Sequence, residues 1–375
     1  MGVRVLHVIS SLKGYGAERQ VLNLLPLLGN EQVDVGALAV YSSPLSDEER
    51  CRLKVPSIDV GRRSRKDYTF VLRLVREIRR FKPDIVHTHT HVGKYWGGLA
   101  AKAAGVRRIV HTEHNPCDPR RNVLERVVDR VLHAVTDRVV TFLSEQRQVL
   151  SRVDGVALEK IAIIPNGLAA SEFVTNTDCS AVRLSLGVRE DEFAVLLIGR
   201  LEHQKNQQLA LRSLKEVNAS LRRRIRLFLL GTGSCEAALR SLTAELHLEE
   251  NVAFLGYRKD VSSLLSCSDL LLMTSLFEGM PLALIEGMLA RVPILSTPWI
   301  GARGMLGNGR YGFISPDFEP RTLAVEMERA LCYEGGRAAV ARRAHERARS
   351  EFDIRRMADA YRALYLDITK VPRVT

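Results

Sequence analysis

Short apolar runs alternate with amphipathic segments along the chain, and the runs fall into two sets. Segments with helical periodicity, such as Phe70–Phe81 and Gln207–Val217, lie between them. Repeated strand–helix units predict a parallel sheet covered by helices on both faces. The sequence therefore predicts an α/β protein with two Rossmann-like domains. The first set of runs is Val3–Ile9, Val35–Val40, Ile85–His89, Ile109–Thr112 and Val139–Phe142, and the second is Ala194–Ile198, Ile225–Leu230, Val252–Leu255, Leu270–Thr274 and Pro293–Ser296.

A stretch without strand or helix periodicity separates the two sets. It contains the turn sequence Pro165-Asn166-Gly167 and the polar stretch Val174–Ser180, both typical of a hinge. We therefore expect one domain at residues 1–168 and a second at residues 169–351. A last amphipathic helix is expected at Phe352–Leu366, with one face formed by Phe352, Met357, Tyr361 and Leu364.

The composition fits two hydrophobic cores. The chain has 375 residues, 46% hydrophobic and 26% charged, as in soluble globular proteins. Its longest apolar runs are far shorter than the roughly 20 residues that span a bilayer, and we expect no signal peptide. Six scattered cysteines without CxxC spacing argue against zinc and a disulfide framework, and they are consistent with a cytoplasmic location.

The net charge of +12 is concentrated in the first half, where residues 1–160 carry nine more basic than acidic residues. Such a surface attracts nucleic acid, phospholipid headgroups or phosphorylated substrates. Nucleic acid is the least favoured of these, because aromatic residues form only 6% of the chain and none interleave the basic clusters.

One basic segment, residues 61–82, also carries an apolar stripe. Two interpretations stay open, a surface helix whose stripe packs in the core and a helix whose arginines meet an anionic membrane, and both can hold together. The stripe consists of Phe70, Val71, Leu74, Val75 and Ile78, and the arginines around it are Arg73, Arg76, Arg79 and Arg80.

A glycine-containing turn, KGYGAERQ at residues 13–20, follows the first strand and precedes a helix. This is the position of a phosphate-binding loop. The third glycine of a dinucleotide fingerprint would fall at Arg19, which is too large for the close helix–strand packing required there. The turn therefore disfavours a nicotinamide-dependent oxidoreductase.

Polar residues after the strands of the second set are candidates for a ligand site, because ligands of open α/β sheets bind beyond the carboxyl ends of the strands. Gly199-Arg200 ends one strand, and Lys205 follows five residues later. An arginine fork and a mobile lysine suit a diphosphate. A pair of solvated surface cations is the alternative.

The segment SLFEGMPLALIEGM, residues 275–288, follows the strand Leu270–Thr274. Pro281 suits the first turn of a helix, so the backbone N–H groups of Gly279–Leu282 would point toward phosphate or sugar oxygens. Glu278 lies before this helix and Glu286 lies within it. We expect the two carboxylates to bind different parts of an elongated ligand. A helix cap and an exposed glutamate are the alternative.

Histidines follow two strands of the first set. His111, Glu113 and His114 come from IVHTEHN, and DIVHTHTH contributes His87, His89 and His91. Alternate residues of a strand share a face, so the second group is either a metal cluster or cleft lining. Because no carboxylate-rich DxD motif accompanies it, we predict no metal site.

Taken together, these motifs resemble the retaining family 4 glycosyltransferases, which have the two-domain GT-B fold with two Rossmann-like domains facing each other across a cleft. The resemblance runs in order from about residue 3 to residue 366, and the Glu278-x7-Glu286 signature is its specific part. The motifs that carry it are Gly14–Glu18, Thr112-Glu113-His114, Pro165-Asn166-Gly167, Gly199-Arg200 with Lys205, Phe254-Leu255-Gly256 and Glu278-x7-Glu286.

The resemblance implies a nucleotide-sugar donor, UDP- or GDP-activated, bound mainly by the second domain, and an acceptor bound by the first. It assigns His114, Arg200, Lys205 and Glu278 to catalysis, and it implies that the C-terminal helix, residues 352–375, crosses back onto the first domain. The donor-binding residues that it implies are Gly16, Arg200, Lys205, Tyr257, Arg258, Glu278, Gly279, Met280, Pro281, Leu282 and Glu286.

By the same resemblance, the leaving diphosphate accepts the acceptor's proton on the face where the acceptor attacks, and no cofactor or metal is needed. The expected function is transfer of a sugar to a glycan or lipid-linked acceptor in cell-envelope, exopolysaccharide or lipopolysaccharide biosynthesis, with possible peripheral association to the inner face of the cytoplasmic membrane. The alternatives are a nucleotide-sugar epimerase, a sugar phosphorylase of GT-B type, and a non-catalytic membrane-associated protein that binds sugar nucleotides.

Two motifs depart from the family pattern. Asn166-Gly167-Leu168-Ala169 replaces the common Asn-Gly-Ile/Val-Asp, and Gly301-Ala302-Arg303-Gly304 lacks the glutamate of Gly-Gly-x-x-Glu. These departures concern loops near the donor and leave the expected fold unchanged.

Overall fold

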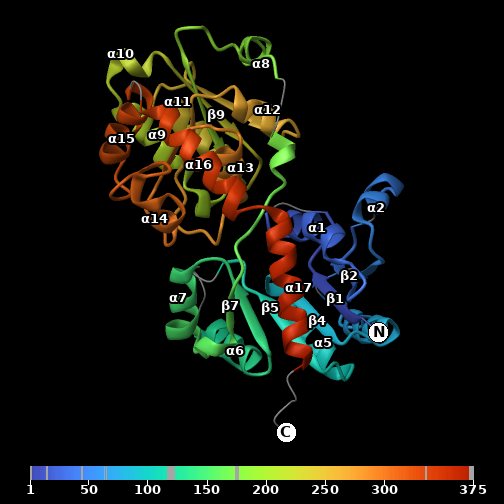
Figure 1. The fold of residues 1–375 in the computed structure, drawn as a ribbon. Coiled ribbons are helices and arrows are strands. Elements are labelled where there is room, and N and C mark those ends of the chain that lie inside the picture. Colours follow the sequence, from blue (N-terminus) through green and yellow to red (C-terminus); the bar gives the residue numbers. More distant parts are fainter. Residues whose placement is uncertain are drawn as a thin grey trace. The chain divides into compact units, whose positions relative to one another are not determined.

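The chain folds into two compact units, each built on one parallel sheet (Figure 1). The first unit comprises Met1–Gly167 and Ile354–Thr375, and the second comprises Leu168–Asp353. The computed structural model describes residues 2–13, 16–43, 45–62, 64, 66–115, 123–173, 177–333 and 336–370. Gly14 and Tyr15 of the glycine-containing turn and residues 174–176 of the expected hinge lie outside these ranges.

The first unit contains a seven-stranded sheet in the order β3-β2-β1-β4-β5-β6-β7. Its strands are β1 (Val3–Ile9), β2 (Val33–Tyr41), β3 (Ser57–Arg62), β4 (Ile85–His89), β5 (Arg108–Thr112), β6 (Arg138–Thr141) and β7 (Ile161–Ile163). Its helices are α1 (Ala17–Leu28), α2 (Asp47–Leu53), α3 (Phe70–Phe81), α4 (Thr90–Val92), the π-helix η1 (Gly93–Gly97), α5 (Gly98–Ala103), α6 (Val123–Ala134), α7 (Ser144–Asp154), the short 3₁₀ turn η2 (Leu158–Lys160) and α17 (Ile354–Lys370).

The second unit contains a six-stranded sheet in the order β10-β9-β8-β11-β12-β13. Its strands are β8 (Phe193–Ile198), β9 (Ile225–Leu230), β10 (Val252–Gly256), β11 (Leu270–Met273), β12 (Ile294–Ser296) and β13 (Phe313–Ile314). Its helices are α8 (Cys179–Ser185), α9 (Gln207–Glu216), α10 (Ala219–Arg222), α11 (Glu236–Glu245), α12 (Val261–Ser266), α13 (Leu282–Leu289), α14 (Ala302–Met305), α15 (Pro320–Cys332) and α16 (Arg337–Glu351), with 3₁₀ turns η3 (Ala170–Phe173), η4 (His203–Lys205) and η5 (Gly307–Gly309).

The prediction of two Rossmann-like α/β halves is confirmed. Every strand pair in both sheets is parallel. The hydrophobic pattern did not predict three of the strands, β3, β7 and β13. They are short or only partly buried, so their sequences lack a continuous apolar run.

Helices cover both faces of the first sheet because side chains of a strand alternate between its faces. Val5 and Ile9 of β1 pack with α1 and α17, whereas Leu6 and Val8 pack with α3 and α5. The apolar stripe of α3 therefore lies in the core, where Phe70, Leu74 and Ile78 are fully buried. Its arginines are exposed, with Arg76 81% and Arg80 77% accessible.

Helix α17 packs on the first sheet although it follows the whole second unit in the sequence. Met357, Tyr361 and Tyr365 belong to the same buried cluster as β1 and α1, and Arg362 donates a hydrogen bond to the carbonyl of Leu27. The predicted helix face was right at Met357 and Tyr361 but wrong at its start. Phe352 lies in the second unit, where its carbonyl accepts a hydrogen bond from the N–H of Leu168.

A disulfide joins Cys179 and Cys267 in the second unit, across 88 residues of sequence. It links the start of α8 to the residue after α12. The sequence argument against a disulfide framework missed this pair, because the argument rested on short cysteine spacings and the fold joins distant positions. Among the described residues, the thiols of Cys51, Cys235 and Cys332 are free.

Within the described ranges, every helix is too short or too polar to cross a bilayer.

The packing of α17 predicts that Tyr361 stabilises the first unit. Tyr361→Ala should lower the free energy of unfolding of that unit by about 3–5 kcal/mol, the scale for removing a buried aromatic side chain. Trp96 lies beside the core of the first unit and Trp299 is buried in the second. Denaturation followed by Trp96 fluorescence in a Trp299→Phe background therefore reports on the first unit alone.

Tyr68→Ala is the matched control, because Tyr68 belongs to the first unit and is 67% exposed. Equal denaturation midpoints for Tyr361→Ala and Tyr68→Ala would show that α17 does not stabilise the unit.

Candidate functional site

The first candidate group lies at the carboxyl ends of β1, β4 and β5, which are neighbours in the first sheet. His7 in β1 is paired with His87 in β4, and His89 at the end of β4 is paired with Thr112 of β5. His114 follows β5 by two residues. Parallel pairing therefore brings together polar side chains that are up to 107 positions apart in the sequence.

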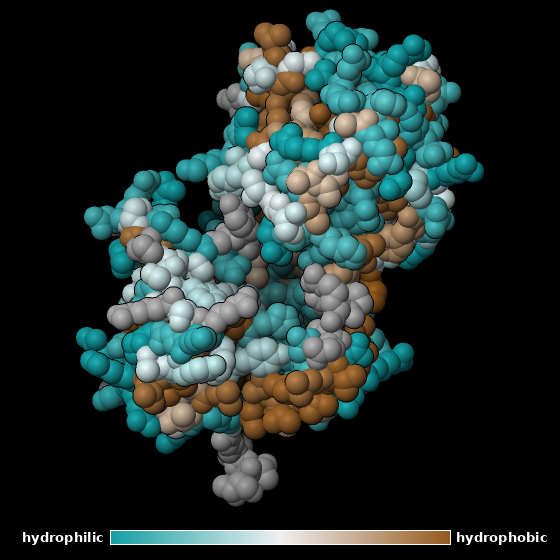
Figure 2. All heavy atoms as spheres, turned by 180° about the vertical axis from the view of Figure 1, so that it is seen from behind, coloured by the Kyte–Doolittle hydropathy of each residue, from teal (hydrophilic) through white to brown (hydrophobic). Residues whose placement is uncertain are grey.

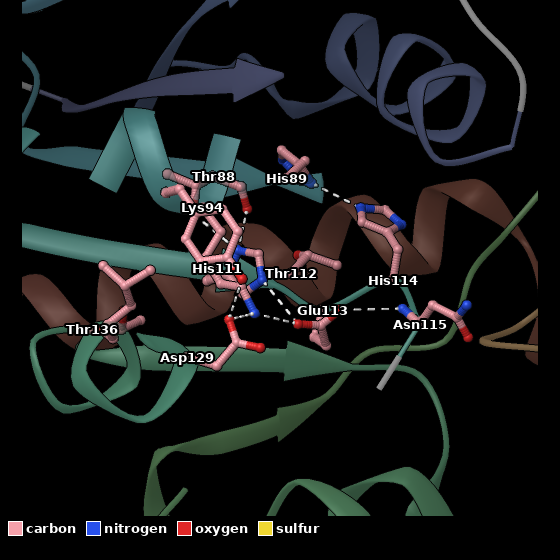
Figure 3. Close-up of polar contacts among 12 residues, drawn as sticks. Thr88, His89, Lys94, His111, Thr112, Glu113, His114, Asn115, Asp129 and Thr136 are labelled. Carbon is pink, nitrogen blue, oxygen red and sulfur yellow. Dashed lines mark hydrogen bonds and ion pairs between the residues drawn. The ribbon is translucent and has the colours of Figure 1, made fainter. Parts of the chain in front are cut away.

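Hydrogen bonds join three of these histidines in a row. Nδ1 of His89 lies 3.3 Å from Nε2 of His114 (Figure 3). Nε2 of His89 lies 3.0 Å from Nδ1 of His7, and Nε2 of His7 lies 3.3 Å from the hydroxyl of Tyr365. The row connects His114, the predicted catalytic histidine, with the C-terminal helix.

A second branch begins at the same hydroxyl. The Tyr365 hydroxyl lies 2.6 Å from Nδ1 of His87, and Nε2 of His87 lies 2.8 Å from Oγ1 of Thr112. Oγ1 of Thr112 also lies 3.0 Å from the hydroxyl of Tyr361. Helix α17 therefore contributes two hydroxyl groups that satisfy the buried histidines and threonine of the sheet.

Burial keeps these imidazoles neutral. It lowers the pKa of His7 to about 3 and the pKa of His114 to about 4, with a smaller contribution from His111. Burial and neighbouring histidines lower the pKa values of His87 and His89 well below the ordinary value. A neutral ring has one donor and one acceptor nitrogen. His114 is therefore an uncharged hydrogen-bonding group at neutral pH.

The histidine group differs from the sequence expectation. His91 is on α4 and exposed, because the strand ends at His89 and Thr90 turns the chain with φ 60°. His7 takes the third position, and ligand atoms of His7, His87 and His89 lie within 4.8 Å of one another. They could approach one metal ion, but both ring nitrogens of His87 and His7 already have hydrogen-bond partners.

A buried ion cluster lies beside His114 (Figure 3). The ammonium group of Lys94 lies 2.8 Å from Oε2 of Glu113 and 2.8 Å from Oδ1 of Asp129. Asp129 also accepts a hydrogen bond of 3.1 Å from Tyr95. Glu113 lies 3.4 Å from Nε2 of His111 and accepts the backbone N–H of Asn115. The Glu113 carboxylate therefore contacts His111, which precedes His114 in the sequence, and Asn115, which follows it.

The charges in this cluster hold one another ionised. Burial raises the pKa of Glu113, but Lys94 and His111 outweigh it and hold that pKa well below the ordinary value. Burial likewise opposes ionisation of Lys94, but Glu113 and Asp129 raise its pKa. Removing one partner of such a cluster leaves an uncompensated buried charge, which is strongly destabilising.

Sequence reasoning found Glu113 and His114 but missed Lys94 and Asp129. Lys94 is on the π-helix η1 and Asp129 is on α6, so neither lies directly after a strand. Gly93 and Gly97 gave the available signal: a Cβ atom at either position would lie under 3.0 Å from Val8. These glycines let η1 approach β1 closely, which brings Lys94 into the core.

In the second unit, the structure brings together two predicted residues, Lys205 and Glu278. Nζ of Lys205 lies 2.5 Å from Oε1 of Glu278. The same oxygen accepts a hydrogen bond of 2.6 Å from Ser275, and Oε2 accepts one of 3.3 Å from Gln204. Gln204 also binds the carbonyl of Phe277. The Glu278 carboxylate is therefore fixed in place by Lys205 and by two further donors, Ser275 and Gln204, that the sequence analysis did not identify.

The second carboxylate of the Glu278-x7-Glu286 signature, Glu286, is on α13. Pro281 caps this helix with extended backbone, and Gly279, Met280, Pro281 and Leu282 before and at its start are all buried. Glu286 is 2% exposed. Glu278 lies in the loop and Glu286 more than one turn into the helix, so they occupy different parts of the site.

Glycines allow Lys205 to reach Glu278. Gly199 ends β8 with φ 152°, and a Cβ atom there would lie 2.9 Å from Cε of Lys205. A Cβ atom at Gly231 would lie 2.2 Å from the carbonyl oxygen of Gly199. Only glycine fits at these two positions without a shift of the backbone.

The remaining donor candidates of the second unit are at its surface. Arg200 is exposed at the end of β8, and Tyr257 is 56% exposed after β10. Arg258 is paired with Asp260 through contacts of 2.5 Å and 2.8 Å. The structure therefore does not bring Tyr257 or Arg258 into the Lys205–Glu278 pair.

Gly16 caps α1 in the first unit. Its φ of 63° is the left-handed conformation that favours glycine, and its carbonyl accepts the N–H of Gln20.

Two family models match the chain in succession. Residues 15–172 match "Glycosyltransferase Family 4", and residues 181–349 match "Glycosyl transferases group 1". Together they cover most of both units.

Known proteins resemble the chain over most of its length. It is 27% identical over 323 residues to the UDP-Gal:alpha-D-GlcNAc-diphosphoundecaprenol alpha-1,3-galactosyltransferase of Escherichia coli, covering 83% of this chain and 84% of the relative. It is 29% identical over 314 residues to the putative glycosyltransferase EpsD of Bacillus subtilis, covering 79% and 80%. The solved structure of Anabaena Alr3699/HepE in complex with UDP and glucose superposes with a TM-score of 0.84 at 21% identity, covering 98% of this chain and all of the other.

The neutral histidines predict that acid destabilises the first unit. In the unfolded chain histidine has a pKa near 6.5, whereas the folded values are about 3 for His7 and about 4 for His114. The unfolded chain therefore binds more protons below about pH 7. The free energy of unfolding should fall as the pH is lowered toward 4, by up to about 1.4 kcal/mol per pH unit for each such histidine.

Thermal denaturation between pH 7.5 and pH 5, followed by Trp96 in the Trp299→Phe background, measures this dependence. His7→Asn should flatten the pH dependence, and His247→Asn, at an exposed position of the second unit, should leave it unchanged. A melting temperature of the first unit that is constant over this pH range would contradict the assignment of neutral, buried histidines.

Proposed function

Because this chain belongs to the family 4 glycosyltransferases, with the GT-B fold, we propose that it is a retaining and metal-independent transferase that uses a UDP- or GDP-sugar. The observation that carries the proposal is the fixed Lys205–Glu278 pair at the strand ends of the second unit, with Glu286 buried on the helix that follows. Lys205 offers a group for the phosphates, Glu278 one for the sugar and Glu286 one for the ribose of the nucleoside.

The second unit binds the donor in this proposal. Lys205 and Arg200 bind the diphosphate, Glu278 accepts hydrogen bonds from the sugar hydroxyls, and Glu286 accepts them from the ribose. An ammonium group has three donors, so Lys205 can hold Glu278 and a phosphate oxygen at once. The backbone of Gly279, Met280, Pro281 and Leu282 contacts phosphate or sugar, and Tyr257 and Arg258 contact the base.

The first unit contributes Gly16 at the donor phosphates and His114 at the reacting sugar. A neutral His114 can donate or accept a hydrogen bond at a sugar hydroxyl without placing a charge beside it. The His89 contact fixes the orientation of its ring, and Glu113 holds the following backbone N–H of Asn115. These contacts support a positioning role for the histidine row and a direct role for His114.

In the transfer step, the bond between the anomeric carbon and the diphosphate oxygen breaks while the acceptor oxygen bonds to the same carbon on the same face. The acceptor's proton passes to the leaving diphosphate oxygen, whose growing negative charge Arg200 and Lys205 stabilise. A double displacement would need a free carboxylate nucleophile, as in retaining glycosidases. Glu278 does not meet that need, because Lys205, Ser275 and Gln204 hold it.

The acceptor is a glycan or lipid-linked sugar of the cell envelope or an exopolysaccharide, and the enzyme works at the inner face of the cytoplasmic membrane. The E. coli relative, whose name specifies a diphosphoundecaprenol-linked acceptor, supports this assignment. The excess of nine positive charges in residues 1–160 suits a phosphorylated acceptor and an anionic membrane surface.

Substitutions of Glu278 and Glu286 should have different effects in an assay with nucleotide-sugar donors. With UDP- and GDP-sugars and acceptor, the protein should release nucleoside diphosphate. Glu278→Gln should lower kcat about 10²-fold, the scale for one preorganised interaction with the transition state, while UDP or GDP affinity stays nearly intact. Glu286→Gln should weaken nucleoside diphosphate binding by about 1–3 kcal/mol, as for loss of a charged acceptor. The rate of nucleoside diphosphate formation measures kcat, and calorimetric titration measures nucleoside diphosphate affinity.

Glu249→Gln is the control, because Glu249 is an exposed glutamate of the same unit. Equal losses of affinity in both test variants would contradict the division of roles. Release of a free sugar epimer or a sugar phosphate in place of a glycoside would favour the epimerase or phosphorylase alternatives, and tight binding without turnover would favour a non-catalytic protein.

Divalent metal should be dispensable, since Arg200 and Lys205 supply the positive charge that a metal would otherwise bring to the diphosphate. The rate of transfer in excess chelator should be at least half the untreated rate. Complete loss that manganese or magnesium restores would reject metal independence and direct attention to His7, His87 and His89.

A further inference from the structure

Helix α6 turns its apolar side chains outward. Val123 is 78% exposed, Leu124 71%, Val127 50% and Val131 62%. Positions 123, 127 and 131 are four residues apart, so these side chains form one continuous stripe on the helix. The space-filling view shows hydrophobic residues gathered on the lower part of this unit (Figure 2). Val128 and Val135 extend the exposed stripe.

The inward face of the same helix is mostly polar. Asp129 is fully buried and binds Lys94 and Tyr95, and His133 is 3% exposed. Leu132 is the buried apolar residue of the helix within the described ranges. A surface helix ordinarily buries its apolar stripe and exposes its charges. Here the ion pair between Asp129 and Lys94 holds the helix to η1, and the apolar stripe is exposed.

An exposed apolar stripe of this kind marks an interaction site. A second copy of the chain is a poor occupant, because a 12-residue helix is about 18 Å long and about 10 Å wide. Its face thus offers on the order of 180 Å², far below the roughly 800 Å² that each partner buries in a stable protein complex. A lipid surface has no such requirement, since one helix can lie in the headgroup region with its apolar face buried.

Charge around α6 also favours a lipid surface. Arg130 is exposed on the helix, and Arg126, one turn before it, is half-buried. Glu125 is the opposing exposed acid on the helix. An apolar stripe bordered by cations matches anionic headgroups above an acyl boundary.

We propose that α6 docks the first unit on an anionic membrane by inserting the side chains of Val123, Leu124, Val127 and Val131. Helix α3 was the earlier candidate, but its stripe is in the core, so it offers arginines without insertion. The inference rests on the proposed function for its purpose, which is to bring the enzyme to a lipid-linked acceptor. The docking itself is independent of catalysis.

Vesicle co-sedimentation tests the proposal with the full chain, using vesicles of equal parts phosphatidylglycerol and phosphatidylcholine, and vesicles of phosphatidylcholine alone. The wild type should bind the anionic vesicles, more weakly at high salt. Val127→Ser/Val131→Ser should weaken this binding at least tenfold. Serine and valine have similar helix propensities, so the helix itself is preserved. The control is Leu72→Ser/Leu184→Ser, at side chains that are 72% and 78% exposed on α3 and α8.

Binding of UDP or GDP by calorimetry keeps this test separate from the proposed function. Unchanged nucleotide binding with lost vesicle binding supports docking through α6. If the wild type does not bind UDP or GDP, the proposed function is wrong, and the vesicle experiment still tests docking through α6. Wild-type protein that ignores anionic vesicles at low salt, or α6 and control variants that bind them equally, would overturn the docking proposal.

Insertion can be measured directly with Val131→Trp. Its fluorescence should shift to shorter wavelength and be quenched by brominated phosphatidylcholine in the anionic vesicles, whereas Leu184→Trp should not respond. The lipid-free protein is also run on gel filtration. If it dimerises and the Val131→Trp fluorescence already shifts to shorter wavelength in that dimer, a second copy covers the stripe and the membrane proposal is wrong.

Discussion

The ammonium group of Lys94 joins three parts of the first unit inside the core. It binds Glu113 after β5 and Asp129 on α6, and it comes from the π-helix between α4 and α5. An unpaired charge at this depth would be costly, so each partner constrains the other two. The position of His114 and the outward stripe of α6 both depend on this contact, because Glu113 adjoins the histidine and Asp129 turns the polar face of the helix inward.

The two units use charge differently. At the strand ends of the first unit, the ionised Lys94 cluster lies beside histidines that burial holds neutral, and hydroxyl groups of α17 form hydrogen bonds with His87 and Thr112. In the second, the buried Glu278 is paired with the partly buried Lys205 beyond the strand ends. In the proposed function, the neutral histidine row suits the hydroxyl groups of a sugar, and the ammonium group of Lys205 suits a charged leaving group whose contacts change during the reaction.

The parts of this protein that could be predicted from sequence are those encoded within one strand–helix unit. The Glu278–Glu286 segment follows from local spacing, as do most of the strands. Contacts between side chains from different strand–helix segments could not be predicted this way. Lys94 meets Asp129 across 35 residues and Cys179 meets Cys267 across 88, and His7 replaces His91 because a single turn at Thr90 ends the strand. An amphipathic pattern also does not tell which face of a helix turns inward. Helix α6 buries its polar face and exposes its apolar one, which is uncommon.

Helix α17 gives the chain an unusual order of completion during synthesis. A ribosome makes the strands of the first unit early, but Tyr361 and Tyr365, which form hydrogen bonds with Thr112, His87 and His7, follow the whole second unit in the sequence. Domains usually fold as units in the order in which they are made. Here all residues of the second unit are available before the first unit can close its core. The nascent first unit therefore cannot complete its core until α17 has been synthesised.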